Sequence, residues 1–204
     1  MPYNDFTYPS VLTDFSLGLV EGAIFATEAA PLTLAPEFLQ RITASATLAQ
    51  AISTEKARSE FIIAPILLEL RLLTTKPFGL FSGVELRADA KAGLTGICDF
   101  LITRQPLQTV VRTPLLALVE AKNDNLRTGL GQCIAEMLAA QIVNQNAPDA
   151  ADYLNRSIYG VVTTGTLWQF LKLDGQTLTI EPTEHTLTDL TTVLALLRQI
   201  VEHG

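Results

Sequence analysis

The sequence predicts an α/β domain in which a mixed central β-sheet is covered by helices. Two observations lead to this prediction. Four segments have apolar residues at helical spacing, and the runs between them are rich in β-forming residues. Glycine, proline and asparagine separate these segments, as is typical of turns. A chain of 204 residues is long enough for one such domain with a single large core.

The predicted elements follow one another in the order helices, strands, helix, strands, helix. Residues 1–35 show no clear pattern, and within them the segment 15–27 mixes glycine with apolar residues and could form either a strand or irregular packing. The Ser53-Thr54 pair offers an N-cap, and Pro65 should kink the following helix or divide it in two. Tight turns are expected near Gly165 and at the Asp174-Gly175 pair. Helices are predicted over 35–52, 55–75, 128–146 and 186–204, and strands over 83–90, 93–105, 115–122 and, divided by these turns, 158–180.

Composition restricts the class of protein. The chain is 48% hydrophobic and 17% charged, but no apolar run has the length of a membrane span. Its start has no basic region followed by an apolar one, so no signal peptide is expected. Cys98 and Cys133 are too few for a disulfide framework. We therefore expect a soluble cytoplasmic protein with free thiols and no membrane partner.

Charge is distributed unevenly along the chain. The net charge of −7 argues against a generic nucleic-acid binder. The segment 56–127 nevertheless carries ten Lys or Arg and seven Asp or Glu, whereas the remainder carries four basic and fourteen acidic residues. The middle of the chain could therefore present a locally positive cleft, or its surface charge could simply be uneven.

The predicted strand over 115–122 ends in two opposite charges, Glu120 and Lys122. A short apolar run bounded by breakers indicates a buried strand, although a buried helical segment has the same pattern. Charges at the end of a buried strand are costly unless they are paired or bind something. An ordinary ion pair at a solvated strand end is the simplest alternative. Alternation places Glu120 and Lys122 on one face with Leu116 and Leu118, and Leu115, Ala117, Val119 and Ala121 on the other.

Few other residues could support catalysis. The two histidines, His185 and His203, both lie in or near the last predicted helix. The sequence has no GxSxG motif, no Cys/His cluster with zinc spacing and no phosphate-binding glycine loop. Carboxylates, one lysine and one glutamine remain as the candidates.

Asp99 lies inside an apolar strand, against the usual preference of aspartate. It could occupy an exposed position on an edge strand. If its strand pairs with the next one, however, Asp99 and Glu120 can meet at one end of the sheet. A divalent cation would offset their repulsion, and carboxylate and carbonyl oxygens are ligands that Mg²⁺ prefers. Beside such a cation, Lys122 could orient a bound water and stabilise negative charge on a phosphate.

This constellation resembles the PD-(D/E)XK nuclease superfamily, whose members have the restriction-endonuclease-like fold. The resemblance covers 56–173 and includes the segment "YGVVTTGTLWQFLKL", which resembles a strand pair of type I restriction subunits and of related small cyanobacterial and bacterial proteins. Cys98 stands where the family's proline would be, and Glu136 stands where some branches carry tyrosine. The matching positions are Glu60 in "RSEFIIAPIL", Asp99 in "GICDF", Glu120 and Lys122 in "VEAKN", and Gln132 in "GLGQCIAEM", the last as in the RecB-like and type I restriction branches.

The resemblance implies a metal-dependent DNA nuclease, either an endonuclease or an exonuclease. Mg²⁺, or Mn²⁺ in its place, would be held by Asp99, Glu120 and the carbonyl group of Ala121. Lys122 would position the attacking water. Glu60 would contact the metal through water or bind a second ion.

Three further features complete this hypothesis. Gln132 shares a helix face with Glu136 and could orient Lys122 or contact the phosphate. Gly129 and Gly131 suggest a close backbone approach near the start of that helix. Outside the motifs, Arg127, Lys91 and Arg87 could contact phosphate groups, although surface basic side chains commonly have no specific partner.

The domain is expected to span 1–204, with an N-terminal helical extension over 1–50, a nuclease core over 56–173 and a C-terminal helix over 185–204. A homodimer or a partner subunit could add to the modest DNA affinity of an acidic chain. Two alternatives stay open. The fold could serve as a catalytically silent binding or assembly module, or as a structural domain in which Glu120 and Lys122 merely pair. RNA, branched DNA and damaged DNA are alternative substrates.

Overall fold

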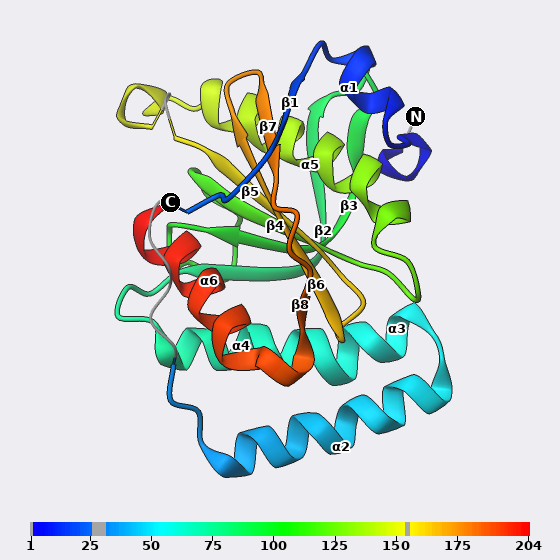
Figure 1. Cartoon of the computed structure of the whole chain (residues 1–204). Coiled ribbons are helices and arrows are strands. Elements are labelled where there is room, and N and C mark those ends of the chain that lie inside the picture. Colours follow the sequence, from blue (N-terminus) through cyan, green and yellow to red (C-terminus); the bar gives the residue numbers. More distant parts are fainter. Residues whose placement is uncertain (1, 26–31, 154–155) are drawn as a thin grey trace.

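A computed structural model of the chain describes residues 2–25, 32–153 and 156–204 (Figure 1). Within these ranges the strands form one mixed sheet with helices on both faces, which confirms the predicted α/β class. The strands are β1 (Gly18–Glu21), β2 (Gly79–Asp89), β3 (Leu94–Thr103), β4 (Leu115–Ala121), β5 (Ile158–Thr163), β6 (Leu167–Asp174), β7 (Thr177–Ile180) and β8 (His185–Thr186). Their order across the sheet is β1-β7-β6-β5-β4-β3-β2, and β8 pairs with β6.

The helices are α1 (Ser10–Asp14), α2 (Pro36–Ile52), α3 (Glu55–Arg58), α4 (Ala64–Leu73), α5 (Arg127–Gln145) and α6 (Leu190–His203). Short 3₁₀ turns occupy Tyr3–Asp5, Ala150–Asp152 and Leu187–Asp189. One hydrophobic cluster lies between the sheet and α5, together with α1 and the N-terminal turn. The other lies between the opposite face of the sheet and α4 and α6, and it extends to α2, which packs on the outer side of the segment that contains α3 and α4 (Figure 1).

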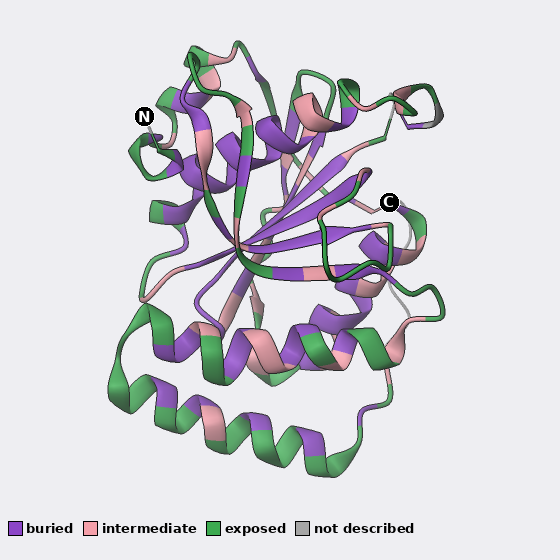
Figure 2. Cartoon of the chain, turned by 180° about the vertical axis from the view of Figure 1, so that it is seen from behind, coloured by how far each residue is buried: buried purple, intermediate pink, exposed green. Residues whose placement is uncertain are grey.

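The centre of the sheet is the most buried part of the molecule. Every residue of β4 and β5 is buried, and the two strands run parallel to each other. Figure 2 shows these central strands within the purple core and the outer side of α2 in green. The two expected turns are present, since Gly165 and Gly175 have φ values of 79° and 58°, which glycine adopts readily.

One irregularity alters the expected alternation along β4. The register with β3 shifts between Ile102 and Thr103, so that Thr103 pairs with Leu115 and Leu116 is the extra residue. Leu115 therefore packs in the cluster beneath α5, and Leu116 packs in the opposite cluster. The sequence had placed these two leucines on the reverse faces, because alternation was extended through the bulge.

Pro65 neither breaks nor separates the helical segment that contains it. A π-helical turn, Ser59–Ile63, joins α3 to α4, and the N–H of Ala64 bonds to the carbonyl oxygen of Ser59 five residues earlier. Pro65 then occupies the first turn of α4, where its missing N–H costs little. The segment is thus continuous from Glu55 to Leu73.

The ends of the chain differ from the sequence prediction. Residues 1–50 do not form a purely helical extension, because β1 joins the sheet as an edge strand parallel to β7. The C-terminal helix begins at Leu190, since His185 and Thr186 form β8. Part of the expectation for residues 1–35 falls on 1 and 26–31, which lie outside the described residues. Across the described ranges, no helix has both the length and the apolar character needed to cross a membrane.

Candidate active site

The pairing of β3 with β4 brings Asp99 to the end of β4. The two strands are antiparallel, with Phe100 opposite Val119, so the pairing of the candidate strands, which the sequence left as a condition, is present. Beyond this pair, the N–H of Ala121 donates a 2.8 Å hydrogen bond to Oδ2 of Asp99. The carboxylate of Asp99 therefore lies directly beside the segment that contains Glu120 and Lys122.

A local twist of β3 explains how the Asp99 side chain reaches β4. Cys98 and Phe100 should share a face by alternation, but Cys98 packs in the cluster beneath α5 and Phe100 in the opposite cluster. On β2, Gly83 has a φ of 64° and lies between the residues that pair with Phe100 and Cys98. The change of face at Asp99 lets its side chain point along the sheet toward the backbone of β4.

Lys122 is held at both its backbone and its head group. Its N–H donates a 2.8 Å hydrogen bond to the carbonyl oxygen of Thr163, which extends the β4–β5 pairing by one residue. Its Nζ lies 2.6 Å from Oε1 of Glu120 and 3.2 Å from Oε1 of Gln132. A second carboxylate, that of Glu55, lies 3.9 Å away at the start of α3. Gln132 thus contacts Lys122, as one of its two expected roles requires.

The glycines of α5 allow this helix to approach β4 closely, as the sequence predicted. A Cβ atom on Gly129 would lie 2.7 Å from Cγ1 of Val162 and 2.9 Å from Cγ of Lys122. A Cβ atom on Gly131 would lie 2.4 Å from the carbonyl oxygen of Phe6. All three distances are shorter than ordinary van der Waals contacts. The aliphatic part of Lys122 therefore passes over a helix position that has no side chain.

The carboxylate of Glu120 is buried, and only one of its two oxygens, Oε1, has a hydrogen-bond partner within the described part of the chain. Its residue is 1% exposed, and its Oε2 atom has no hydrogen-bond partner among the described atoms. Burial, together with the negative charge of Asp99, raises the pKa of Glu120 to about 8, although Lys122 acts in the opposite direction. For Lys122, burial lowers the pKa, but the carboxylates of Glu120 and Glu55 more than offset it and the net pKa is raised.

A small cleft beside this cluster contains several of the predicted residues. Its volume is about 250 Å³. Glu60 enters it from the π-helical turn, half-exposed and 2.8 Å from the ammonium of Lys56. Glu120 instead lies on the α5 side, where it meets Lys122. The cleft is lined by Glu55, Lys56, Ser59, Glu60, Ser82, Asp99 and Ala121.

The three predicted phosphate-binding residues are not found in the lining of this cleft. Arg87 pairs with Glu85 at 2.7 Å on the exposed surface of β2. Lys91 lies in the turn between β2 and β3. The guanidinium of Arg127 lies 5.7 Å from the ring of Tyr8 and lines a separate cavity of about 340 Å³.

Two residues near the site were missed by sequence reasoning. Glu55 follows the N-cap Thr54, whose side chain accepts a hydrogen bond from Ala57, and its acidic character looked like an ordinary helix start. Arg58 is buried, and its guanidinium bonds to Oδ1 of Asn123 and to the carbonyl oxygen of Thr164. A basic residue in a helix is normally exposed to solvent, so nothing in the sequence pattern indicated that Arg58 would be buried.

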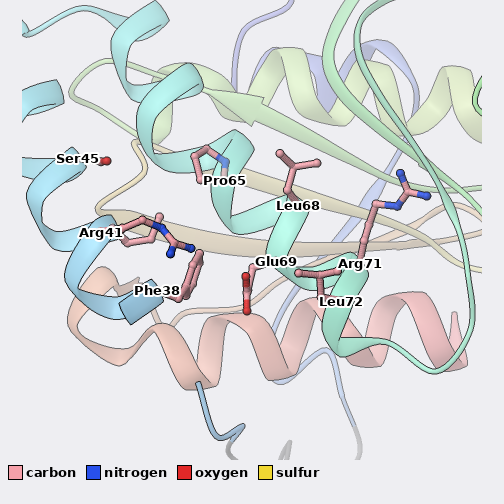
Figure 3. A pocket seen from close by; sticks show the side chains of 9 residues that line it. Phe38, Arg41, Ser45, Pro65, Leu68, Glu69, Arg71 and Leu72 are labelled. Carbon is pink, nitrogen blue, oxygen red and sulfur yellow. The ribbon is translucent and has the colours of Figure 1, made fainter. Parts of the chain in front are cut away.

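A larger groove lies elsewhere, between α2 and α4. Its volume is about 600 Å³, and Figure 3 shows Leu68 and Leu72 of α4 on one side and Phe38 and Arg41 of α2 on the other. This groove is mostly apolar and is lined by none of the carboxylates near β4. It therefore belongs to a different surface from the predicted site.

The described residues include no group of three or more Asp, Glu, His or Cys side chains arranged to hold a metal ion. The donor set that could hold one is smaller: the carboxylates of Asp99 and Glu120 and the carbonyl group of Ala121. The unpartnered Oε2 of Glu120 and the repulsion from Asp99 both suit a cation between these groups. Glu60 lines the same cleft from the π-helical turn, but its carboxylate is ion-paired with Lys56.

No protein-family model matches the chain, and no curated protein is significantly similar to it.

Proposed function

We propose that this protein is a metal-dependent nuclease that hydrolyses phosphodiester bonds in DNA. The observation that carries the proposal is the buried carboxylate of Glu120, which has one oxygen without a partner among the described residues and an ammonium group 2.6 Å from its other oxygen, and whose pKa is raised by burial and by the negative charge of Asp99. Two carboxylates at the end of a central strand can bind a cation, and the lysine beside them can bind a phosphate. The resemblance to the PD-(D/E)XK superfamily supports the same assignment.

The residues present fit Mg²⁺ or Mn²⁺ by their chemistry. Asp99, Glu120 and the carbonyl group of Ala121 would hold the ion, with Glu60 at the opposite wall of the cleft. Such an ion, when bound, polarises phosphoryl oxygens and lowers the pKa of its water. Lys122 would orient the attacking water and stabilise negative charge on the phosphate. Gln132 would hold the ammonium of Lys122 in place, through the 3.2 Å contact between the two side chains.

A catalytically silent binding or assembly module is the second candidate. It is favoured by the two ion pairs that occupy the proposed groups, Lys122 with Glu120 and Lys56 with Glu60. An acidic chain with a net charge of −7 would also bind DNA weakly by itself. A second copy or a partner subunit sharing the cleft would then supply the missing basic surface. The free, buried cysteines suit a cytoplasmic setting for either function.

Cleavage assays test the nuclease proposal directly. The protein is incubated with supercoiled, linear and single-stranded DNA and with RNA, in Mg²⁺, Mn²⁺ or a chelator. Asp99→Ala and Lys122→Ala should abolish metal-dependent cutting, while Glu37→Ala, which removes an exposed acid on α2, should leave it unchanged. Equal residual cutting by all four proteins would indicate contamination.

Calorimetry distinguishes the second candidate. If no protein cuts any substrate and Mg²⁺ binding shows no dependence on Asp99, the nuclease proposal fails and a binding or assembly role is favoured. If the wild type binds Mg²⁺ and Asp99→Ala does not, but neither protein cuts, the metal site is present and the substrates tested are the wrong ones.

A further inference from the structure

Glu136 is a buried acid one helical turn beyond Gln132 on α5. Its residue has no exposed surface, and its Oε1 atom accepts a 3.2 Å hydrogen bond from Nε2 of Gln132. Its Oε2 atom has no hydrogen-bond partner in the described part of the chain. A buried carboxyl group with half of its capacity unused is costly. The hydrogen bond from Gln132 is therefore the polar contact that fixes the position of the Glu136 carboxyl group.

Gln132 connects Glu136 to Lys122 through the two ends of its amide. Oε1 of Gln132 lies 3.2 Å from Nζ of Lys122, and Nε2 faces Glu136. The two ends of an amide have almost the same shape, so hydrogen-bond partners decide which way it points. The ammonium of Lys122 can only donate, and the facing oxygen of Glu136 accepts. Each neighbour therefore favours the same orientation.

Without an acceptor at position 136, one of these two constraints is lost. The NH₂ group of Gln132 would then be buried without an acceptor, and among the described residues the amide would be held only by its contact with Lys122. If the amide moves to find another acceptor, the head group of Lys122 keeps Glu120 as a partner but loses the contact that fixes it from the α5 side.

We propose that Glu136 is a positioning residue for Lys122, acting through the amide of Gln132. The inference rests on the proposed function in one respect, namely that Lys122 acts in catalysis. Burial and the nearby charge of Glu120 raise the pKa of Glu136 well above its ordinary value. The raised pKa favours the protonated form, whose carbonyl oxygen still accepts from Gln132 without adding negative charge behind Glu120.

Two substitutions separate the acceptor from the volume of the side chain. Glu136→Gln keeps an acceptor oxygen, whereas Glu136→Met has a similar size and none. Glu136→Met should lower kcat for DNA cleavage by between about tenfold and a hundredfold, because a small misplacement of a catalytic group has effects of this order. KM should stay nearly unchanged. Glu136→Gln should retain most of the activity.

A second measurement reports the orientation of Gln132 itself. In glutamine-labelled protein, the side-chain amide NMR signals of Gln132, assigned with Gln132→Met, should shift in Glu136→Met and remain close to those of the wild type in Glu136→Gln. Thermal unfolding checks that each variant is folded. Glu136→Ala is a second variant without an acceptor, to be used if Glu136→Met does not fold.

The outcomes distinguish the two proposals. Unchanged kcat and unchanged Gln132 signals in folded Glu136→Met would overturn the positioning role, and so would an equal loss of activity in Glu136→Gln. If the wild type cuts no nucleic acid and shows no Mg²⁺ binding that depends on Asp99, the nuclease proposal fails, but the Gln132 signals still decide whether Glu136 orients the amide. Shifted signals with unchanged kcat would show that the orientation has no part in catalysis and would also contradict the proposal.

Discussion

The aliphatic part of Lys122 crosses α5 at Gly129, so this glycine should matter to the site rather than only to the helix. In Gly129→Ala, the new methyl group would come within 2.7 Å of Val162, which is buried in β5, and within 2.9 Å of Lys122. The contact with Val162 can be relieved only if that side chain or α5 shifts, and the contact with Lys122 displaces the flexible lysine side chain. We expect cleavage to fall by about tenfold or more.

The stability of Gly129→Ala should change much less than its cleavage activity. Overpacking costs about 1–3 kcal/mol, and replacing a helical glycine by alanine returns about 1 kcal/mol. Urea unfolding measures this balance. Gly131→Ala is the matched control, because its methyl group would meet the backbone of Phe6 and Thr7 rather than Lys122. It should lose more stability but retain cleavage per folded molecule. Full activity in Gly129→Ala would show that Lys122 does not depend on this passage.

At the level of elements, a buried arginine, Arg58, attaches α3 to the loops at the end of β4 and β5. Nε of Arg58 lies 3.2 Å from Oδ1 of Asn123, and NH1 lies 3.2 Å from the carbonyl oxygen of Thr164. Asp124 is 3.8 Å away and mostly exposed. Since α3 and the π-helical turn carry Glu55 and Glu60, this attachment also fixes the far wall of the cleft.

Arg58→Met should therefore destabilise the protein and loosen the cleft together. Methionine preserves much of the aliphatic volume but leaves the carbonyl oxygen of Thr164 without its donor, which costs about 1–3 kcal/mol. Urea unfolding should show this loss, and proteolysis should cut more readily near α3. Lys56→Met, which removes an exposed ion pair on the same helix, should leave stability unchanged. If both variants unfold alike, Arg58 does not anchor α3.

For the whole molecule, the sequence predicted the elements well where hydrophobic periodicity is strong. The strands around Asp99 and Glu120 and the helices over 36–52 and 127–145 lie close to their predicted positions. A strand was only one of two alternatives for the segment that contains the edge strand β1, because Leu19 and Val20 are exposed and their pairing partners on β7 are far away in the sequence. The bulge at Leu116 could not be predicted, since it depends on the register with β3.

The candidate site could likewise be predicted only in part. Asp99, Glu120 and Lys122 could be selected from the sequence because charges stand out in apolar strands. The chain of contacts from Lys122 through Gln132 to Glu136 depends on how α5 packs on β4, which no local pattern determines. The burial of Arg58 depends in the same way on where α3 meets the loops of distant strands. The charged residues could be recognised individually, but their mutual contacts required the tertiary structure.

The buried acids should give the whole molecule an unusual dependence of stability on pH. Burial raises the pKa of Glu120 to about 8 and that of Glu136 above its ordinary value, so the folded protein binds protons more tightly than the unfolded chain. Their contribution is complete below the unfolded pKa of 4.5 and is lost as the pH rises through the folded pKa. In metal-free solution, the free energy of unfolding should fall between about pH 5 and pH 8, by up to about 1.4 kcal/mol per pH unit for each proton.

Two groups with shifted pKa values do not reverse this trend. The lowered pKa of Glu202 acts below its ordinary value of 4.5, and the raised pKa of Lys122 acts above 10.5. Chemical denaturation at a series of pH values, with a chelator present, measures the profile. Glu120→Gln together with Glu136→Gln should flatten it, and a wild-type stability that rises from pH 5 to 8 would contradict the assignment. Added Mg²⁺ should flatten the wild-type profile as well, because a cation held by Asp99 and Glu120 would stabilise the ionised carboxylate that otherwise needs a proton.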